Sequence, residues 1–149
     1  MRSFILKKNI IQVYARTLSQ IITSTEDLQK ELEPYYTKLK TALDGDQLAG
    51  VSDADLADIQ AEFQDGTDQY KQLNERLNKL QAPARFMGKH RNLTNAYQTY
   101  VDGCQAMTDS IQLADHKVDQ NVFAAAETGQ NEAMDHIIHL VTGILSTQA

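Results

Sequence analysis

The amino-acid sequence predicts an all-α fold, an antiparallel up-down bundle of three long helices and a shorter C-terminal fourth helix, with coiled-coil-like packing. Three observations predict it. Apolar side chains recur at spacings of three and four, which places them on one stripe of a helix. Stripes of this length need other helices to cover them. Two prolines and seven glycines leave long stretches without a helix breaker. The chain length suits one domain over residues 1–149.

The first helix is predicted over residues 4–43, where the apolar stripe is unbroken. The stripe consists of Ile11, Tyr14, Leu18, Ile21, Thr25, Leu28, Leu32, Tyr35, Leu39 and Ala42. Pro34 lies inside this segment and has no amide hydrogen for the carbonyl of Lys30, so we expect a kink or two abutting helices. Asp44, Gly45 and Asp46 then predict a turn.

The second helix is predicted over residues 52–81. Ser52 is expected to cap its free amides, and Asp53 and Asp55 suit the positive end of its dipole. Its stripe consists of Leu56, Ile59, Phe63, Gly66, Tyr70, Leu73, Leu77 and Leu80. The helix ends ahead of Pro83, which suits the first turn of the next helix because its missing amide is not needed there.

The third helix is predicted over residues 84–118 or longer, and the pattern allows it to continue as far as Ala126. Its stripe consists of Phe86, His90, Leu93, Tyr97, Tyr100, Cys104, Met107, Ile111, Ala114 and Val118. Thr128, Gly129, Gln130 and Asn131 predict a turn. The fourth helix is then predicted over residues 131–146, with Met134, Ile137, Ile138, Val141, Ile144 and Leu145 on one face.

Short connections favour antiparallel neighbours, and this sets a register for the bundle. Folding the second helix back on the first puts Leu80 beside Tyr14. Folding the third back near Pro83 puts Tyr100 near the level of Gly66. Because Gly66 leaves a gap in its stripe, we expect Tyr100 or Tyr97 to pack over it. The same tyrosine-rich interior, formed by Gly66, Tyr70, Tyr97 and Tyr100, is the candidate small-molecule cavity.

The net charge of −6 is distributed unevenly along the chain. Basic residues dominate the first helix start and the junction of the second and third helices, and acidic residues dominate the segment between Lys40 and Lys71. An antiparallel bundle therefore acquires a basic and an acidic pole. One interpretation is that the charges serve solubility and complement the helix dipoles. The other is that the basic pole binds an acidic partner or an anionic membrane surface. The absence of a nucleic-acid motif and a pI of about 5.1 argue against nucleic acid.

In the same register, the start of the first helix extends past the connection between the second and third helices. This overhang is both apolar and basic, and its candidate partner-contact residues are Phe4, Ile5, Leu6, Lys7, Lys8 and Ile10. Such a helix end favours a protein partner, a homodimer or a membrane surface. The alternative is that it frays or folds over the connection.

The sequence contains no recognisable catalytic motif, so we expect a protein that is not an enzyme and needs no cofactor. The Glu-x-x-His spacing of di-metal bundles is absent. Glu132, His136 and His139 form a cluster expected on the solvated face, where a surface zinc contact is the alternative to ordinary solvated side chains. His90 is expected to be a satisfied core or boundary histidine near the basic pole, and Cys104 a small buried hydrophobe. The N-terminus lacks an export signal, which predicts a cytoplasmic protein.

A recognisable pattern spans the hairpin of the second and third helices and consists of Leu77, Leu80, Ala82, Pro83, His90, Leu93, Ala96, Tyr97, Tyr100, Val101 and Gly103. It resembles a pattern in small helical proteins and lipoproteins of Gram-positive bacteria. The pattern is a Leu-x-x-Leu-x-Ala-Pro helix end before a histidine-containing helix, over about a third of the chain. The resemblance implies a helical bundle and carries no activity. This chain departs from the lipoproteins in lacking a lipid-accepting cysteine near its start.

These observations favour a non-catalytic interaction or structural protein that associates through the overhang with a protein partner or with a second copy of itself. The alternatives are a bundle that binds a small molecule or metal, and a peripheral membrane-surface binder that uses the basic pole.

Overall fold

The computed structural model describes the backbone of residues 2–147 and the side chains of residues 9–147. It confirms the all-α bundle. Its long helices are α1 (Arg2–Asp44), α2 (Asp53–Lys79), α3 (Met87–Asp109) and α4 (Gln120–Ser146). Shorter elements in the connections are η1 (Leu48–Gly50), η2 (Ala84–Phe86), η3 (Leu113–Asp115) and the antiparallel strands β1 (Ile111–Gln112) and β2 (Lys117–Val118).

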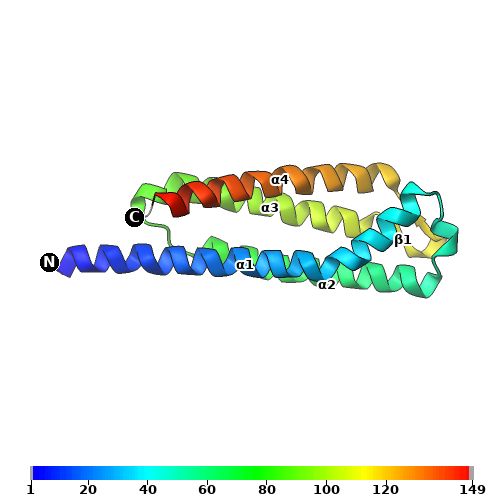
Figure 1. Cartoon of the computed structure of the whole chain (residues 1–149), viewed down its shortest axis with the longest axis horizontal. Coiled ribbons are helices and arrows are strands. Elements are labelled where there is room, and N and C mark those ends of the chain that lie inside the picture. Colours follow the sequence, from blue (N-terminus) through cyan, green and yellow to red (C-terminus); the bar gives the residue numbers. More distant parts are fainter. Residues whose placement is uncertain (1, 148–149) are drawn as a thin grey trace.

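The four long helices lie along one axis in alternating directions, as Figure 1 shows. α1 packs on α2, α2 on α3, and α3 most extensively on α4, whereas α1 and α4 make few contacts. The bundle is therefore two helical hairpins, α1–α2 and α3–α4, joined through α2 and α3. Its fourth side, the α1–α4 seam, is loosely closed.

α1 is one helix of 43 residues that passes through Pro34. Figure 1 shows its axis turning in the light-blue to cyan stretch, after which its C-terminal part rises toward the start of α4. Of the two alternatives left by the sequence, the kinked single helix is the one observed. Pro34 leaves the Lys30 carbonyl without its usual donor, and the helix bends there.

The boundary between the third and fourth helices was predicted wrongly. α3 ends at Asp109 rather than near residue 118, and the chain turns back through the β1–β2 hairpin, in which buried Ile111 pairs with buried Val118. α4 begins at Gln120, where the Asp119 carboxylate accepts a hydrogen bond from the Val122 amide at 3.1 Å. Apolar spacing alone fits both a helix and this short hairpin.

The fourth helix is therefore not short and does not start at residue 131. α4 has 27 residues, as many as α2, and it runs through Thr128–Asn131 without a turn. The poor helix formers in that stretch are overridden because Phe123 and Ala126 before it, and Ala133 and Ile137 after it, are all buried on one stripe. At the start of α2, by contrast, the prediction is confirmed: the Ser52 hydroxyl accepts from the Asp55 amide.

The prediction that a tyrosine of the third helix fills the Gly66 gap is wrong. Leu80 packs against the core cluster that contains Tyr14. A Cβ on Gly66 would lie 2.5 Å from Leu32 Cδ1, so Leu32 of α1 covers the glycine. Tyr100 instead packs edge-on against Tyr70, one helical turn further along α2, with ring centroids 5.1 Å apart. Gly66 faces α1, whereas the prediction assumed that it faces α3.

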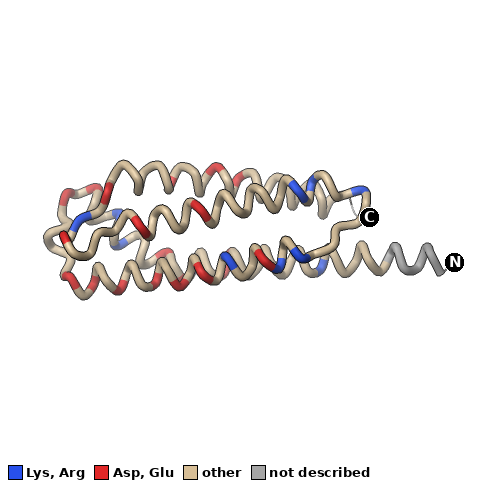
Figure 2. Tube along the Cα trace, turned by 180° about the vertical axis from the view of Figure 1, so that it is seen from behind, with Lys and Arg blue, Asp and Glu red and all other residues tan. Residues whose placement is uncertain are grey.

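Charge is segregated along the bundle, though less completely than predicted. Figure 2 shows Lys and Arg gathered at the end near the C-terminus, while Asp and Glu dominate the rest. Lysines also lie in the acidic half, where Lys38 pairs with Asp55 at 2.9 Å and Lys40 pairs with Asp44 at 3.2 Å. The acidic half is thus partly neutralised by its own ion pairs.

Candidate functional site

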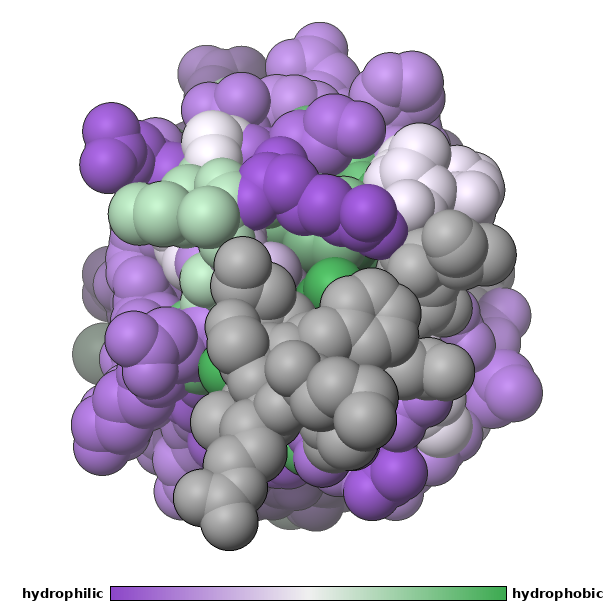
Figure 3. All heavy atoms as spheres, turned by 90° about the vertical axis from the view of Figure 1, so that its left-hand side faces the viewer, coloured by the Kyte–Doolittle hydropathy of each residue, from purple (hydrophilic) through white to green (hydrophobic). Residues whose placement is uncertain are grey.

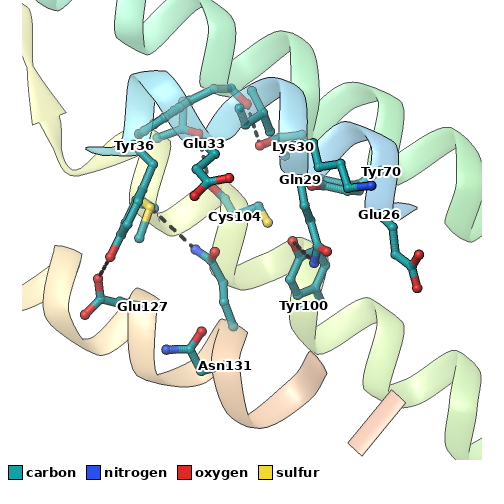
Figure 4. A pocket seen from close by; sticks show the side chains of 16 residues that line it. Glu26, Gln29, Lys30, Glu33, Tyr36, Tyr70, Tyr100, Cys104, Glu127 and Asn131 are labelled. Carbon is teal, nitrogen blue, oxygen red and sulfur yellow. Dashed lines mark hydrogen bonds between the residues drawn. The ribbon is translucent and has the colours of Figure 1, made fainter. Parts of the chain in front are cut away.

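The loosely closed α1–α4 seam contains a cavity of about 580 Å³ that opens to solvent, referred to below as the seam cavity. Its inner wall is largely apolar and comprises Leu32, Phe63, Tyr70, Tyr100, Cys104 and Met107. Its mouth is polar and comprises Glu26, Lys30, Glu33, Glu127 and Asn131. All four helices therefore contribute to one concave surface, which Figure 4 shows from close by.

One end of the cavity is closed by Tyr36, which joins α1 to α4. Its ring stacks on Phe123 with centroids 6.2 Å apart, and its hydroxyl donates a hydrogen bond to the Glu127 carboxylate. The Lys40 amine lies 3.7 Å from the same carboxylate. These contacts lie just after Pro34, so the bend in α1 brings the two helices together here and leaves the seam open before it.

Two glycines hold the helical hairpins tightly on either side of the cavity. Gly66 lets α2 approach Leu32 of α1, as described above. On α3, a Cβ at Gly103 would lie 2.9 Å from Gln130 Cγ, and the Gln130 amide donates to the Gly103 carbonyl at 3.0 Å. Because the two helices of each hairpin pack closely at this level, the unfilled space lies between the hairpins.

The polar groups of the inner wall are hydrogen-bonded and uncharged. Tyr100 accepts a hydrogen bond from the Gln29 amide at 3.2 Å, and the Thr108 hydroxyl donates to the Cys104 carbonyl at 2.9 Å. Burial raises the pKa of the Cys104 thiol to about 12 and also raises the pKa of Tyr70 and Tyr100. The wall therefore carries no charge near neutral pH and holds no activated nucleophile.

Two of the four predicted cavity residues lie on this wall. Tyr70 and Tyr100 line it, whereas Gly66 is covered by Leu32. Tyr97 packs against Tyr100 with centroids 6.2 Å apart, but it is fully buried and shares a 2.8 Å hydrogen bond with Thr25. Tyr97 supports the wall from behind.

Sequence reasoning missed the residues of the cavity mouth. Glu33 and Glu127 lie on different helices, and each falls outside the apolar stripe of its own helix. On a closed bundle such positions face bulk solvent. Only the open seam turns them toward a common space, so no signal in the sequence identified them.

His90 is the satisfied core histidine that the sequence predicted. Its Nε2 lies 3.1 Å from the Leu77 carbonyl, which only accepts, so this nitrogen carries the hydrogen. Its Nδ1 accepts from the Tyr14 hydroxyl at 2.8 Å. Burial lowers the pKa of His90, and the imidazole is neutral.

The other predicted site residues do not converge. Glu132, His136 and His139 are all exposed on α4, and no group of three His, Cys, Asp or Glu side chains among the described residues is placed to hold a metal ion. The side chains of Phe4, Ile5, Leu6, Lys7 and Lys8 lie outside the described residues. Ile10 is described and is 50% exposed.

Apolar surface is present at the overhang end of the bundle. Ile10 and Val13 of α1 are each about half exposed, as is Met87 at the start of α3. Figure 1 shows the first turns of α1 extending past the α2–α3 connection, and Figure 3 shows apolar atoms beside the residues drawn in grey.

Within the described range, none of the helices has a stretch long and apolar enough to cross a membrane. Comparisons of the chain with protein-family models, with curated proteins and with solved structures found no match.

Proposed function

We propose that this protein is a non-catalytic helical bundle that binds a small molecule in the seam cavity. The observation that carries the proposal is the cavity itself: about 580 Å³, lined by four helices, with an apolar inner wall and a polar mouth. Ligand sites have volumes of roughly 300–1,000 Å³ and combine a mainly apolar lining with a few polar groups.

The chemistry of the wall supports binding rather than catalysis. The buried thiol of Cys104 stays protonated because burial raises its pKa to about 12, and the tyrosine hydroxyls stay protonated for the same reason. Such groups orient a ligand by hydrogen bonding, but they neither attack it nor accept its protons at neutral pH.

A neutral apolar fluorophore tests the proposal. N-phenyl-1-naphthylamine is expected to bind with a saturable rise in fluorescence, and Asn131→Trp is expected to abolish it because the indole covers the mouth. Glu132→Trp is the matched control, since Glu132 is exposed next to Asn131 but does not line the cavity. Equal binding by both variants would place the fluorophore elsewhere and refute the proposal.

A second candidate function is self-association through the overhang end. The half-exposed Ile10 and Val13 favour it, because exposed apolar residues close together on one helix suit an interface. Light scattering on the full chain is expected to give the mass of a dimer, and the double variant Ile10→Asp, Val13→Asp that of a monomer. A monomeric full chain would rule out self-association.

A further inference from the structure

The mouth of the seam cavity is predominantly acidic. Among the described residues that line it, Glu26, Glu33 and Glu127 are carboxylates and Lys30 is the one cation. In the view of Figure 4, Glu26 and the Lys30 amine lie at one end, Glu127 lies at the other, and Glu33 stands between them. A charged ligand group entering here therefore meets a net negative field.

The three carboxylates differ in how far they are compensated. Glu127 accepts the Tyr36 hydroxyl and lies 3.7 Å from the Lys40 amine. Glu26 lies at the same end as Lys30 in Figure 4. Neither Glu26 nor Glu33 forms an ion pair with a described residue. In the view of Figure 4, Glu33 lies between the two ends, away from the Lys30 amine. Glu33 is therefore the carboxylate that we assign to a charged ligand group.

Much of the cavity wall is aromatic. Tyr36, Phe63, Tyr70 and Tyr100 line the cavity, and the rings of Tyr70 and Tyr100 stand nearly perpendicular, at 84°. Aromatic rings attract cations through their quadrupole, and aromatic walls with a carboxylate nearby suit ammonium groups, which shed water easily when alkylated. An anion would face Glu33 with no paired cation beside it and would lose its hydration shell against the same rings.

We propose that the seam cavity takes an organic cation, an apolar or aromatic molecule bearing an alkylated amine. Its ammonium lies beside Glu33, and its apolar body lies against Tyr70 and Tyr100. This assignment rests on the binding function proposed above and specifies the ligand class for that site.

Three probes of nearly the same shape and different charge test it. Benzyltrimethylammonium is the cation, neopentylbenzene is its neutral carbon isostere, and phenylmethanesulfonate is the anion. Titration followed by NMR at about 50 mM salt is expected to give the cation roughly tenfold tighter binding than the neutral isostere, and the anion the weakest. Binding of the cation is expected to weaken as salt is raised, because the mouth is open to water.

Charge variants at exposed positions locate the effect. Glu33→Gln is expected to lower the affinity for the cation about threefold to tenfold and to leave the affinity for the neutral isostere unchanged. Lys30→Gln is expected to raise the affinity for the cation by a smaller factor. Glu31→Gln is the matched control, because Glu31 is exposed on the same turn of α1 and does not line the cavity, so it is expected to change neither.

The outcomes separate this inference from the binding function itself. If the neutral isostere binds and Asn131→Trp blocks it, but the cation binds no tighter, the cavity is a ligand site and the cation assignment is wrong. An equal effect of Glu31→Gln and Glu33→Gln would also overturn the assignment, because it would show only general screening of surface charge. If neither the isostere nor N-phenyl-1-naphthylamine binds, the binding function fails first.

Discussion

At the scale of single residues, the contact between Gly66 and Leu32 couples helix packing to the seam cavity. A Cβ at Gly66 would come within 2.5 Å of Leu32 Cδ1 and 3.2 Å of its Cγ, so the leucine must move. Leu32 also lines the cavity, which offers it the nearest open space. Gly66→Ala is therefore expected to push Leu32 into the cavity and reduce its volume, while it raises the helix propensity of α2.

We expect Gly66→Ala to lower the free energy of unfolding by about 1 kcal/mol, because overpacking costs roughly 1–3 kcal/mol and alanine returns about 0.5–1. The affinity for N-phenyl-1-naphthylamine is expected to fall with it. Gly129→Ala is the control: its Cβ meets open space on α4, so a gain of about 0.5–1 kcal/mol and unchanged affinity are expected. Urea unfolding and fluorescence titration measure both. Equal stability of the two variants would contradict this account.

Two histidines are expected to affect stability in opposite directions as pH changes. Burial lowers the pKa of His90, so below the unfolded pKa of about 6.5 the unfolded chain binds more protons and stability falls. Hydrogen bonds to the Leu48 carbonyl and the Asp53 carboxylate raise the pKa of His116. Its contribution is full below about 6.5 and is lost as pH rises through the raised pKa.

Urea unfolding at pH 5 and pH 8 measures the two contributions. His116→Gln is expected to lose more stability at pH 5, and His90→Gln more at pH 8, each relative to the unchanged chain. If His116→Gln had the same deficit at both pH values, the ion pair with Asp53 would contribute nothing.

At the scale of elements, Pro34 decides the course of α1. Alanine at this position supplies the missing donor to the Lys30 carbonyl and removes the cause of the bend. We expect Pro34→Ala to raise the free energy of unfolding by about 1 kcal/mol, well below the intrinsic value of ~3, because a straighter α1 loses part of the Tyr36 contact with α4. Affinity for N-phenyl-1-naphthylamine is expected to fall. Higher stability with unchanged affinity would separate the bend from the cavity.

The start of α4 depends on its cap. Asp119→Ala removes the acceptor for the Val122 amide and is expected to cost about 1 kcal/mol in urea unfolding. Asp115→Ala is the matched control: Asp115 is exposed in the same connection and makes no ion pair with a described residue. Similar losses for both variants would show that the cap is unimportant.

At the scale of the whole molecule, ligand binding and unfolding are linked through the seam. Because all four helices line the cavity, unfolding destroys the site, and a bound ligand stabilises the folded bundle by mass action. At a hundred times its dissociation constant, benzyltrimethylammonium is expected to add about 2.7 kcal/mol to the free energy of unfolding. Asn131→Trp is expected to remove that gain. Stabilisation that survives in this variant would point to a site outside the seam.

The elements that depend on local pattern could be predicted from the sequence alone. The apolar stripes predicted the helices and the short connections predicted their antiparallel order. Ser52 predicted the start of α2, and the position of His90 predicted its satisfied state. These depend on periodicity and capping, which are properties of neighbouring residues. The hairpin after Asp109 was missed because a run of three- and four-residue spacings fits it as well as a longer helix.

The cavity and its mouth depend on tertiary packing. Which helix fills the gap at Gly66, whether α1 and α4 meet, and whether Glu33 faces solvent or a cavity all depend on the relative placement of whole helices. A bend at one proline and two close glycine contacts set that placement. Residues remote in sequence are brought together by packing energies summed over many contacts. The apolar pattern of each helix is the same whether the seam between two helices is open or closed, so the pattern cannot distinguish the two.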